Sequence, residues 1–169
     1  QPRYDRQIMT ADKDNPAPAW SNEDLRGNPH QALDKAGRVR RMFDSIAGRY
    51  DLNNRLHSFG RDQSWRRSAV AMAEVGPMDR VLDVACGTGD LTLALARKKP
   101  ASILGVDFSS KMLAVAIRKG STVRRPDLSP TPAFKQGDAM NLELDDASCT
   151  VVTIAFGIRN VLDPARAIA

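Results

Sequence analysis

The stretch Arg80-Val-Leu-Asp-Val-Ala-Cys-Gly-Thr-Gly-Asp90 decides the fold of this chain. Its first half is a short apolar run typical of a buried strand, and its second half is a glycine-containing turn that leads into a helix. A second apolar run, Ile103-Leu-Gly-Val-Asp-Phe108, follows, and Asp107 stands near its end. A strand, a glycine turn, a helix and an acid after the next strand together predict a nucleoside-binding α/β unit.

Gly87 and Gly89 form a short G-x-G pattern, without the third glycine of a dinucleotide-binding turn. The pattern therefore favours a nucleoside ligand without phosphates, and S-adenosylmethionine is the candidate. Asp107 stands where a carboxylate can accept hydrogen bonds from both ribose hydroxyls. The alternative is that Asp107 caps a helix that begins near Ser109.

Strands and helices alternate after residue 77. The strands are predicted at 81–86, 103–108, 133–137 and 150–156, and the helices at 90–98, at 109–120 with Gly120 as the C-cap, and from 163. Such alternation requires crossover connections, so the fold class is α/β, with a Rossmann-like parallel sheet flanked by helices. Because four strands are visible, we expect this sheet to be truncated after the fourth strand.

The chain divides into three predicted segments. Residues 1–35 combine prolines and charges without apolar periodicity, which predicts a disordered or loosely packed arm. Residues 36–76 are predicted to form a helical lid or substrate region. Residues 77–169 form the expected Rossmann-like domain, which we expect to be incomplete at its C-terminal end.

Two helices are predicted in the lid region. One face of the first carries apolar residues at helical spacing, namely Val39, Met42, Phe43, Ile46 and Tyr50. The second is predicted from Asp62 to Glu74, before the stop signal Gly76-Pro77. Between them, Asp51–Arg55 is predicted to be a turn.

The composition excludes several classes of protein. The chain has 169 residues, of which 42% are hydrophobic and 27% are charged, as in ordinary globular domains. No apolar run approaches the ~20 residues of a membrane-spanning helix, and the first residues lack a secretory pattern. Cys86 and Cys149 lack metal-ligand spacing, so we expect a cytoplasmic chain without a metal site.

Three motifs carry a family resemblance: Met42-Phe-Asp-Ser-Ile-Ala-Gly-Arg-Tyr-Asp51, Val81-Leu-Asp-Val-Ala-Cys-Gly-Thr-Gly-Asp90 and Thr153-Ile-Ala-Phe-Gly-Ile-Arg-Asn160. The middle motif resembles class I S-adenosylmethionine-dependent methyltransferases. All three together resemble the menaquinone and ubiquinone biosynthesis C-methyltransferase family. The chain departs from the family pattern at Asn53, at Asp62, where a His is usual, and at Ala155, where Ser is frequent.

The resemblance implies S-adenosylmethionine as cofactor. The residues implied in binding it are Asp83, Gly87, Thr88, Gly89, Asp107, Met112, Asp138 and Ala139. Structural alternatives stay open for several of them. Thr88 or Asp90 could cap a helix, Asp83 could make a turn bond, Met112 could be core, and Gly137-Asp138 could be a simple turn.

The resemblance also implies an acceptor, a ring carbon of a polyprenylated quinol. Tyr50, Arg159 and Asn160 are the implied catalytic residues, with Arg159 stabilising a phenolate or lowering the pKa of a nearby group and Asn160 orienting a water. The alternative for Arg159 is an ion pair with Asp51 that closes the lid. His57 is a weaker candidate for a role in catalysis.

The predicted partners follow from this acceptor. A quinol with a polyprenyl tail is lipophilic, so the basic helix Arg38–Tyr50 could lie at the inner face of a membrane, or else pack as a lid over the cofactor. A homo-oligomer stays open. No nucleic acid is expected, because Phe156-Gly-Ile-Arg-Asn160 differs from the motif of base-amine methylases. The alternative functions are a methyltransferase for another small molecule and a truncated, non-catalytic fragment that binds cofactor.

Overall fold

A computed structural model describes residues 35–122 and 130–168 of the chain. The predicted arm, apart from Lys35 itself, therefore lies outside the described residues. In the described ranges, no helix is long and apolar enough to cross a membrane.

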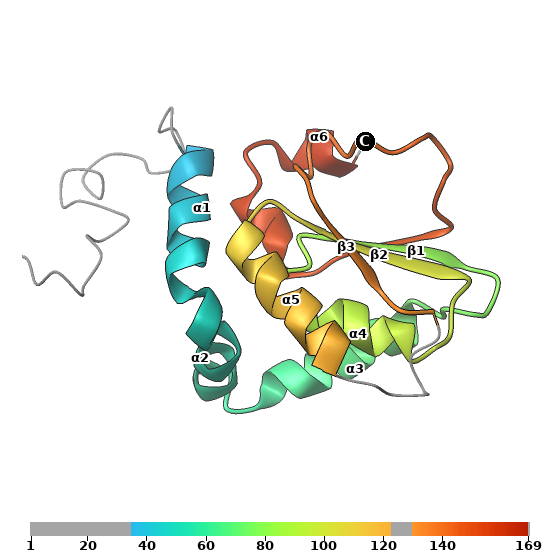
Figure 1. Cartoon of the computed structure of the whole chain (residues 1–169), viewed down its shortest axis with the longest axis horizontal. Coiled ribbons are helices and arrows are strands. Elements are labelled where there is room, and N and C mark those ends of the chain that lie inside the picture. The colour runs from blue at the N-terminus through green and yellow to red at the C-terminus, as the bar shows by residue number, and fades with distance from the viewer. Residues whose placement is uncertain (1–34, 123–129, 169) are drawn as a thin grey trace, which may run out of the picture.

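Four parallel strands form one sheet (Figure 1). They are β1 Arg80–Val84, β2 Ser102–Asp107, β3 Ala133–Gln136 and β4 Val151–Ile154, in the spatial order β3-β2-β1-β4. Strand β1 pairs with both β2 and β4, and Val81 lies opposite Ile103 on one side and Val151 on the other. From β1 the chain adds β2 and β3 on one side, and it then crosses over to add β4 on the other side of β1. In such sheets, ligands bind outside the carboxyl ends of the strands at the position where the strand order reverses.

Alternating apolar side chains of β1 fill a core on each face of the sheet. Val81 packs with Ile103 and with Leu95 of helix α4 (Asp90–Ala96) on one face. Leu82 and Val84 lie in a second cluster, which the segment after β3 helps to cover. The near-continuous burial of β1 is typical of parallel strands covered on both faces, which the apolar run in the sequence predicted.

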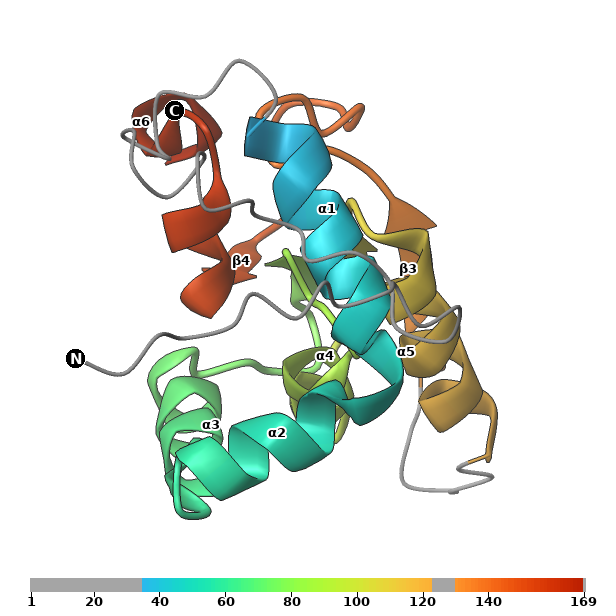
Figure 2. The ribbon, with the colours of Figure 1, turned by 90° about the vertical axis from the view of Figure 1, so that its left-hand side faces the viewer.

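The carboxyl ends of the strands face helices from the first part of the chain. These helices are α1 Lys35–Ile46, the short 3-10 helix η2 Ala47–Arg49, α2 Tyr50–His57 and α3 Arg61–Met72. Figure 2 shows α1 running alongside α5 (Ser110–Thr122), and Val39 of α1 is buried. The predicted helix Arg38–Tyr50 is therefore interrupted by η2, and its first part, α1, packs against the α/β unit, as a lid would.

The predicted turn at Asp51–Arg55 is wrong, because these residues belong to α2. The chain turns later, at Phe59 and Gly60, whose φ angles are 51° and 76°. Asn53 and Asn54 favour turns only weakly, and polar contacts of Asp51 with Thr88 and Lys119 hold α2 in place. Gly60, which adopts positive φ without steric cost, lies in the turn between α2 and α3 and directly precedes α3.

Two further boundaries differ from the sequence prediction. Helix α5 continues past Gly120 to Thr122, and a Cβ at Gly120 would only reach ordinary contact with Phe134. The chain after β4 forms a 3-10 helix η3, Phe156–Asn160, which the sequence did not predict, before helix α6, Pro164–Ile168.

Candidate functional site

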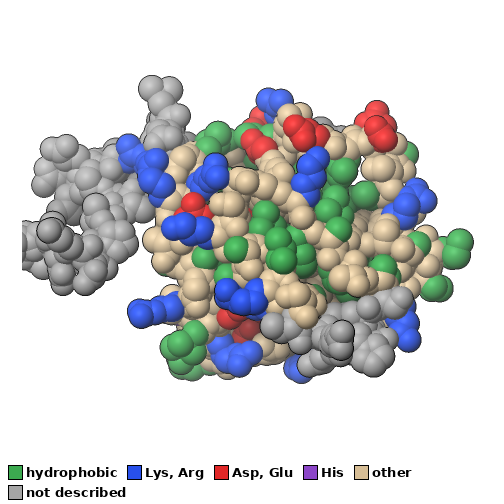
Figure 3. All heavy atoms as spheres, viewed as in Figure 1, with side chains coloured by type: hydrophobic (Ala, Val, Ile, Leu, Met, Phe, Trp, Pro, Cys, Tyr) green, Lys and Arg blue, Asp and Glu red, His purple; other side chains and the backbone are tan. Residues whose placement is uncertain are grey.

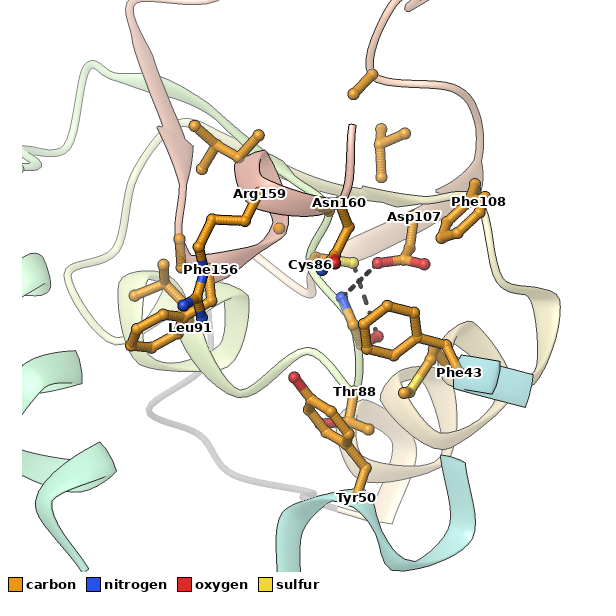
Figure 4. Close-up of a pocket in the computed structure, with 18 of the residues that line it drawn as sticks. Phe43, Tyr50, Cys86, Thr88, Leu91, Asp107, Phe108, Phe156, Arg159 and Asn160 are labelled. Carbon is orange, nitrogen blue, oxygen red and sulfur yellow. Dashed lines mark hydrogen bonds between the residues drawn. The ribbon is translucent and has the colours of Figure 1, made fainter. Parts of the chain in front are cut away.

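A cleft of about 1070 Å³ lies at the carboxyl ends of the strands. Its walls are the loops after β1, β2, β3 and β4 on one side and helices α1, α2 and α3 on the other (Figure 4). The predicted site residues that line it are Tyr50, Gly87, Thr88, Asp107, Met112, Asp138, Ala139, Arg159 and Asn160. Two predicted residues, Asp83 and Gly89, do not line it.

The two glycines of the G-x-G turn have different tasks. Both have positive φ, 57° at Gly87 and 79° at Gly89. A Cβ on Gly87 would meet nothing within 4 Å, so the backbone there faces open space in the cleft. A Cβ on Gly89 would lie 2.8 Å from Cβ of Ala116, so this glycine lets α4 begin close against α5.

Asp107 ends β2 with both carboxylate oxygens fixed by backbone amides. Gly87 N donates to Oδ2 at 2.8 Å, and Ser109 N donates to Oδ1 at 2.9 Å. Burial raises the pKa of Asp107, although the amides of Ser109 and Gly87 oppose the shift. The carboxylate is thereby held rigidly at the edge of the cleft, and each oxygen retains a lone pair for a further donor.

Ser109, and not Asp107, caps helix α5. Its hydroxyl oxygen accepts a hydrogen bond from Met112 N at 3.1 Å. The same hydroxyl donates to Asp44 of α1 at 2.5 Å, so the lid is tied to the residue beside Asp107. Met112 is 1% exposed, and it both belongs to the core and lines the cleft.

Thr88 lies between the G-x-G glycines and is buried. Its hydroxyl donates to Asp51 Oδ1 at 2.6 Å, which joins the turn after β1 to helix α2. Helix α4 has no side-chain cap, so the capping alternative for Thr88 and Asp90 is not what the structure contains.

Asp83 is buried inside the sheet, 1% exposed. Thr92 Oγ1 donates to its Oδ2 at 2.6 Å, and Thr153 Oγ1 donates to its Oδ1 at 2.8 Å. Desolvation raises the pKa of Asp83 to about 6 despite these two hydrogen bonds. The carboxyl group of Asp83 thus links β1 to α4 and β4 and does not make the turn bond considered as its structural alternative.

Asp138 and Ala139 follow β3 at the rim of the cleft. Asp138 Oδ1 accepts from Met140 N at 2.9 Å, and Asp138 and Asn141 form an antiparallel bridge. Among the described residues, Asp138 Oδ2 accepts no hydrogen bond, so the turn and a ligand contact are compatible at this residue.

Arg159 and Asn160 belong to η3, which brings both to the cleft opposite Tyr50 (Figure 4). The Arg159 guanidinium lies over the ring of Phe156, 5.4 Å from its centroid. In the described part of the chain it makes no ion pair with Asp51, which instead pairs with Lys119. The lid-closing ion pair considered for Arg159 is therefore absent, and its guanidinium stays directed to the cleft.

Aromatic rings lie on two sides of the cleft, and three of them, Phe43, Trp65 and Phe156, were not predicted as site residues. Phe43 and Tyr50 form an edge-to-face pair with centroids 6.0 Å apart, and Trp65 and Phe156 lie 5.8 Å apart. All four line the cleft. Helical periodicity assigned Phe43 to a packed face, and such a pattern does not distinguish a face that meets the core from one that meets a cleft.

The loops after β1 and β4 approach each other closely across the sheet. A Cβ on Gly157 would lie 2.3 Å from Cβ of Ala85. Ala85 has a positive φ of 52°, so the turn after β1 holds a strained backbone at this contact. The narrow gap brings the η3 residues next to the glycine turn.

Comparisons with known proteins show which family and fold this chain is similar to. The family model described as the ubiE/COQ5 methyltransferase family matches residues 31–169. The ubiquinone/menaquinone biosynthesis C-methyltransferase UbiE of Geotalea daltonii is 42% identical over 135 residues, 77% of this chain and 55% of that protein. The demethylmenaquinone methyltransferase of Thermus thermophilus is 46% identical over 132 residues, 75% of this chain and 56% of that protein. The chain thus spans about half the length of these curated relatives.

Solved structures share the fold. A putative methyltransferase of Haloferax volcanii, in complex with the activator Trm112, has a TM-score of 0.59 at 25% identity and covers 75% of this chain, while the match covers 52% of that chain. The [4+2]-cyclase SpnF has a TM-score of 0.54 at 30% identity over 63% of this chain and 39% of its own. Since one neighbour is described as a methyltransferase and another as a cyclase, the fold alone does not fix the chemistry.

Proposed function

This chain belongs to the ubiE/COQ5 methyltransferase family, and we propose that its cleft binds S-adenosylmethionine for methyl transfer to a ring carbon of a polyprenylated quinol by the full-length protein. The observation that carries the proposal is the carboxylate of Asp107. It is held by two backbone amides at the carboxyl end of β2, beside the open backbone of Gly87.

The residues of the cleft fit this cofactor. Asp107 would accept from the ribose hydroxyls, and the exposed backbone at Gly87 and Thr88 would contact the methionine part. Met112, Asp138 and Ala139 also line the cleft, and they would contact adenine. No described group of His, Cys, Asp and Glu could hold a metal ion, so the proposal includes no metal.

When bound, S-adenosylmethionine supplies a methyl group that its sulfonium centre already activates. The protein therefore has to align the acceptor and exclude water, and positioning provides much of the rate. The paired rings of Phe43 with Tyr50 and of Trp65 with Phe156 suit a planar aromatic acceptor, because aromatic rings attract one another in stacked or edge-to-face geometries.

Carbon methylation requires an electron-rich ring, so loss of a phenolic proton should lower the barrier. Arg159 would stabilise the resulting phenolate, since its guanidinium lines the cleft and has no carboxylate partner among the described residues. Asn160 and Tyr50 would orient the acceptor hydroxyl or a water that accepts its proton.

Calorimetry with S-adenosylhomocysteine tests the cofactor, and turnover of a demethylmenaquinol analogue by the full-length protein tests the acceptor. The proposal predicts binding by the wild type, weakened by Asp107→Ala, together with turnover. Binding without turnover of the quinol, but with turnover of another small acceptor, would support the second candidate function. Binding with no turnover at all would support a non-catalytic cofactor-binding role.

Because the proposed acceptor is lipophilic, the proposed function also includes contact of the protein with a membrane. Because α1 packs on α5, the membrane contact expected of the first helix is better placed on the outer face of α2. Leu52 and Leu56 are 58% and 62% exposed there, and Phe59, two residues beyond the helix, is 95% exposed. Arg55 and Arg61 flank them, and Figure 3 shows hydrophobic side chains beside Lys and Arg at the lower left, where Figure 1 shows α2.

This basic and apolar face suits an anionic lipid surface, next to a helix whose other face lines the cleft. Flotation with anionic vesicles tests it. The proposal predicts weaker flotation of Leu52→Ser combined with Leu56→Ser than of Met78→Ser, a control at an exposed Met far from α2. Equal flotation of the two variants would refute the α2 contact.

A further inference from the structure

We propose that Lys119 is a positioning residue for this methyl transfer. Its ammonium group holds helix α2 against the turn after β1, so that Tyr50 and the glycine turn face the acceptor in one fixed arrangement. The inference rests on the proposed function, goes beyond its catalytic residues, and concerns a side chain that does not line the cleft.

Lys119 joins carboxylates of two different helices. Its Nζ lies 2.5 Å from Asp51 Oδ2 on α2 and 2.6 Å from Asp90 Oδ1 at the start of α4. Asp51 uses its other oxygen to accept from Thr88. The carboxylate of Asp51 on α2 therefore contacts the lysine of α5 and the hydroxyl of Thr88 at the same time.

The contact extends to α3 through Arg66. Its guanidinium pairs with Asp90 at 3.0 Å and with Asp62 at 3.5 Å. We call these five side chains, Asp51, Asp62, Arg66, Asp90 and Lys119, the bridging cluster. It joins α2, α3, α4 and α5, and all of its members except Lys119 line the cleft.

A single exposed ion pair would hold the two helices together only weakly, because such pairs contribute about 0–1 kcal/mol to stability. The bridging cluster differs because the Lys119 and Arg66 side chains are only 25% and 22% exposed and the charges form a network. If the Lys119 charge is removed, the carboxylates of Asp51 and Asp90 lose the ammonium group that both of them contact. Their repulsion would act between α2 and α4 and move α2 outward.

Outward movement of α2 would affect the acceptor more than the cofactor. Tyr50, the first residue of α2, adjoins Asp51 and lines the cleft. Asp107, by contrast, is fixed by Gly87 and Ser109 without any member of the bridging cluster. Loss of Lys119 should therefore lower kcat/KM for the quinol while leaving affinity for S-adenosylhomocysteine nearly unchanged.

Lys119→Met, Lys119→Arg and the control Lys135→Met in the full-length protein form the test. Lys135 also pairs with one carboxylate, Glu143, but lies outside the cleft. Lys119→Met should lower kcat/KM about tenfold, within the range of coupling energies in charge networks. Lys119→Arg should restore most of it, and Lys135→Met should behave as the wild type.

Hydrogen–deuterium exchange of residues 50–57 gives a readout that does not depend on turnover. Exchange should be faster in Lys119→Met than in the wild type or Lys119→Arg, with β1 unchanged. Faster exchange with an inactive wild type would overturn the proposed function and leave the positioning contact standing. Unchanged exchange and unchanged kcat/KM in Lys119→Met, or equal loss of protection in β1, would overturn the inference.

Discussion

The Gly87 amide donates a hydrogen bond of 2.8 Å to Asp107 Oδ2, across the gap between the ends of β1 and β2. The turn and the acid that the sequence indicated separately are thus one preorganised unit. Because the amide of Ser109 fixes the other oxygen, the carboxylate does not need to reorient when a ligand donates to it. This unit is the reason that we propose S-adenosylmethionine to bind at the carboxyl ends of β1 and β2.

Asp83 should make stability depend on pH. Its pKa is raised in the folded protein from 3.8 to about 6 by burial, so the folded state holds a proton that the unfolded chain has released between these values. The stabilisation is full below pH 3.8 and is lost as pH rises through about 6. Relative to Asp83→Asn, the wild type should gain free energy of unfolding as pH falls from 7 to 4 in urea titrations. If the free energy of unfolding of the wild type relative to Asp83→Asn did not change with pH, or decreased as pH falls, the burial of the Asp83 carboxyl group would be contradicted.

Gly157→Ala should disturb the contact between the loops after β1 and β4. The added Cβ would lie 2.3 Å from Cβ of Ala85, so backbone has to move, at a cost of about 1–3 kcal/mol. Gly48→Ala is the matched control, since its Cβ would meet nothing within 4 Å. Thermal unfolding should separate the two variants. Equal midpoints would mean that the loops are not packed as described.

Cys86 should be a slow nucleophile although it lines the cleft. Burial, followed by the nearby carboxyl groups of Asp83 and Asp107, raises the pKa of its thiol. Because the thiolate is the reactive form, alkylation by iodoacetamide at neutral pH should be much slower in the folded than in the urea-unfolded protein. Mass spectrometry of the Cys86 peptide measures both rates, and similar rates would show that the thiol is not desolvated.

Arg159→Ala should remove turnover while leaving cofactor affinity nearly intact. Its guanidinium lies over Phe156 in η3, whereas the groups that would hold the cofactor lie in the loops after β1, β2 and β3. Arg97→Ala, at an exposed arginine just after α4, is the control for loss of a positive charge. Calorimetry and methyl-transfer assays on both variants decide the assignment, which fails if Arg159→Ala loses cofactor binding.

The sequence was sufficient for the strands that carry the site. The apolar runs before Gly87 and Asp107 are long enough and bounded sharply enough to predict β1, β2 and the turn between them. It was insufficient for α2, since two Asn residues suggested a turn where the structure has a helix held by contacts of Asp51 with Thr88 and Lys119. The true turn signal, Gly60, stands three residues beyond the end of that helix.

Contacts between distant segments explain the rest of what sequence reasoning missed. The pairing of Asp51 with Lys119 depends on how η2 and α1 pack beside α5, and no local pattern encodes it. The ring pair of Trp65 and Phe156 likewise needs both α3 and η3 in place. Helical periodicity identifies which residues share a face, but not whether that face meets the core or a cleft.

A crystal structure of the protein soaked with S-adenosylhomocysteine tests the central claim most directly. The account predicts the ribose with both hydroxyls within hydrogen-bonding distance of the Asp107 carboxylate, and the amino-acid part beside Gly87 and Thr88. A nucleoside bound elsewhere, or an empty cleft with Asp107 still held by the Gly87 and Ser109 amides, would contradict it.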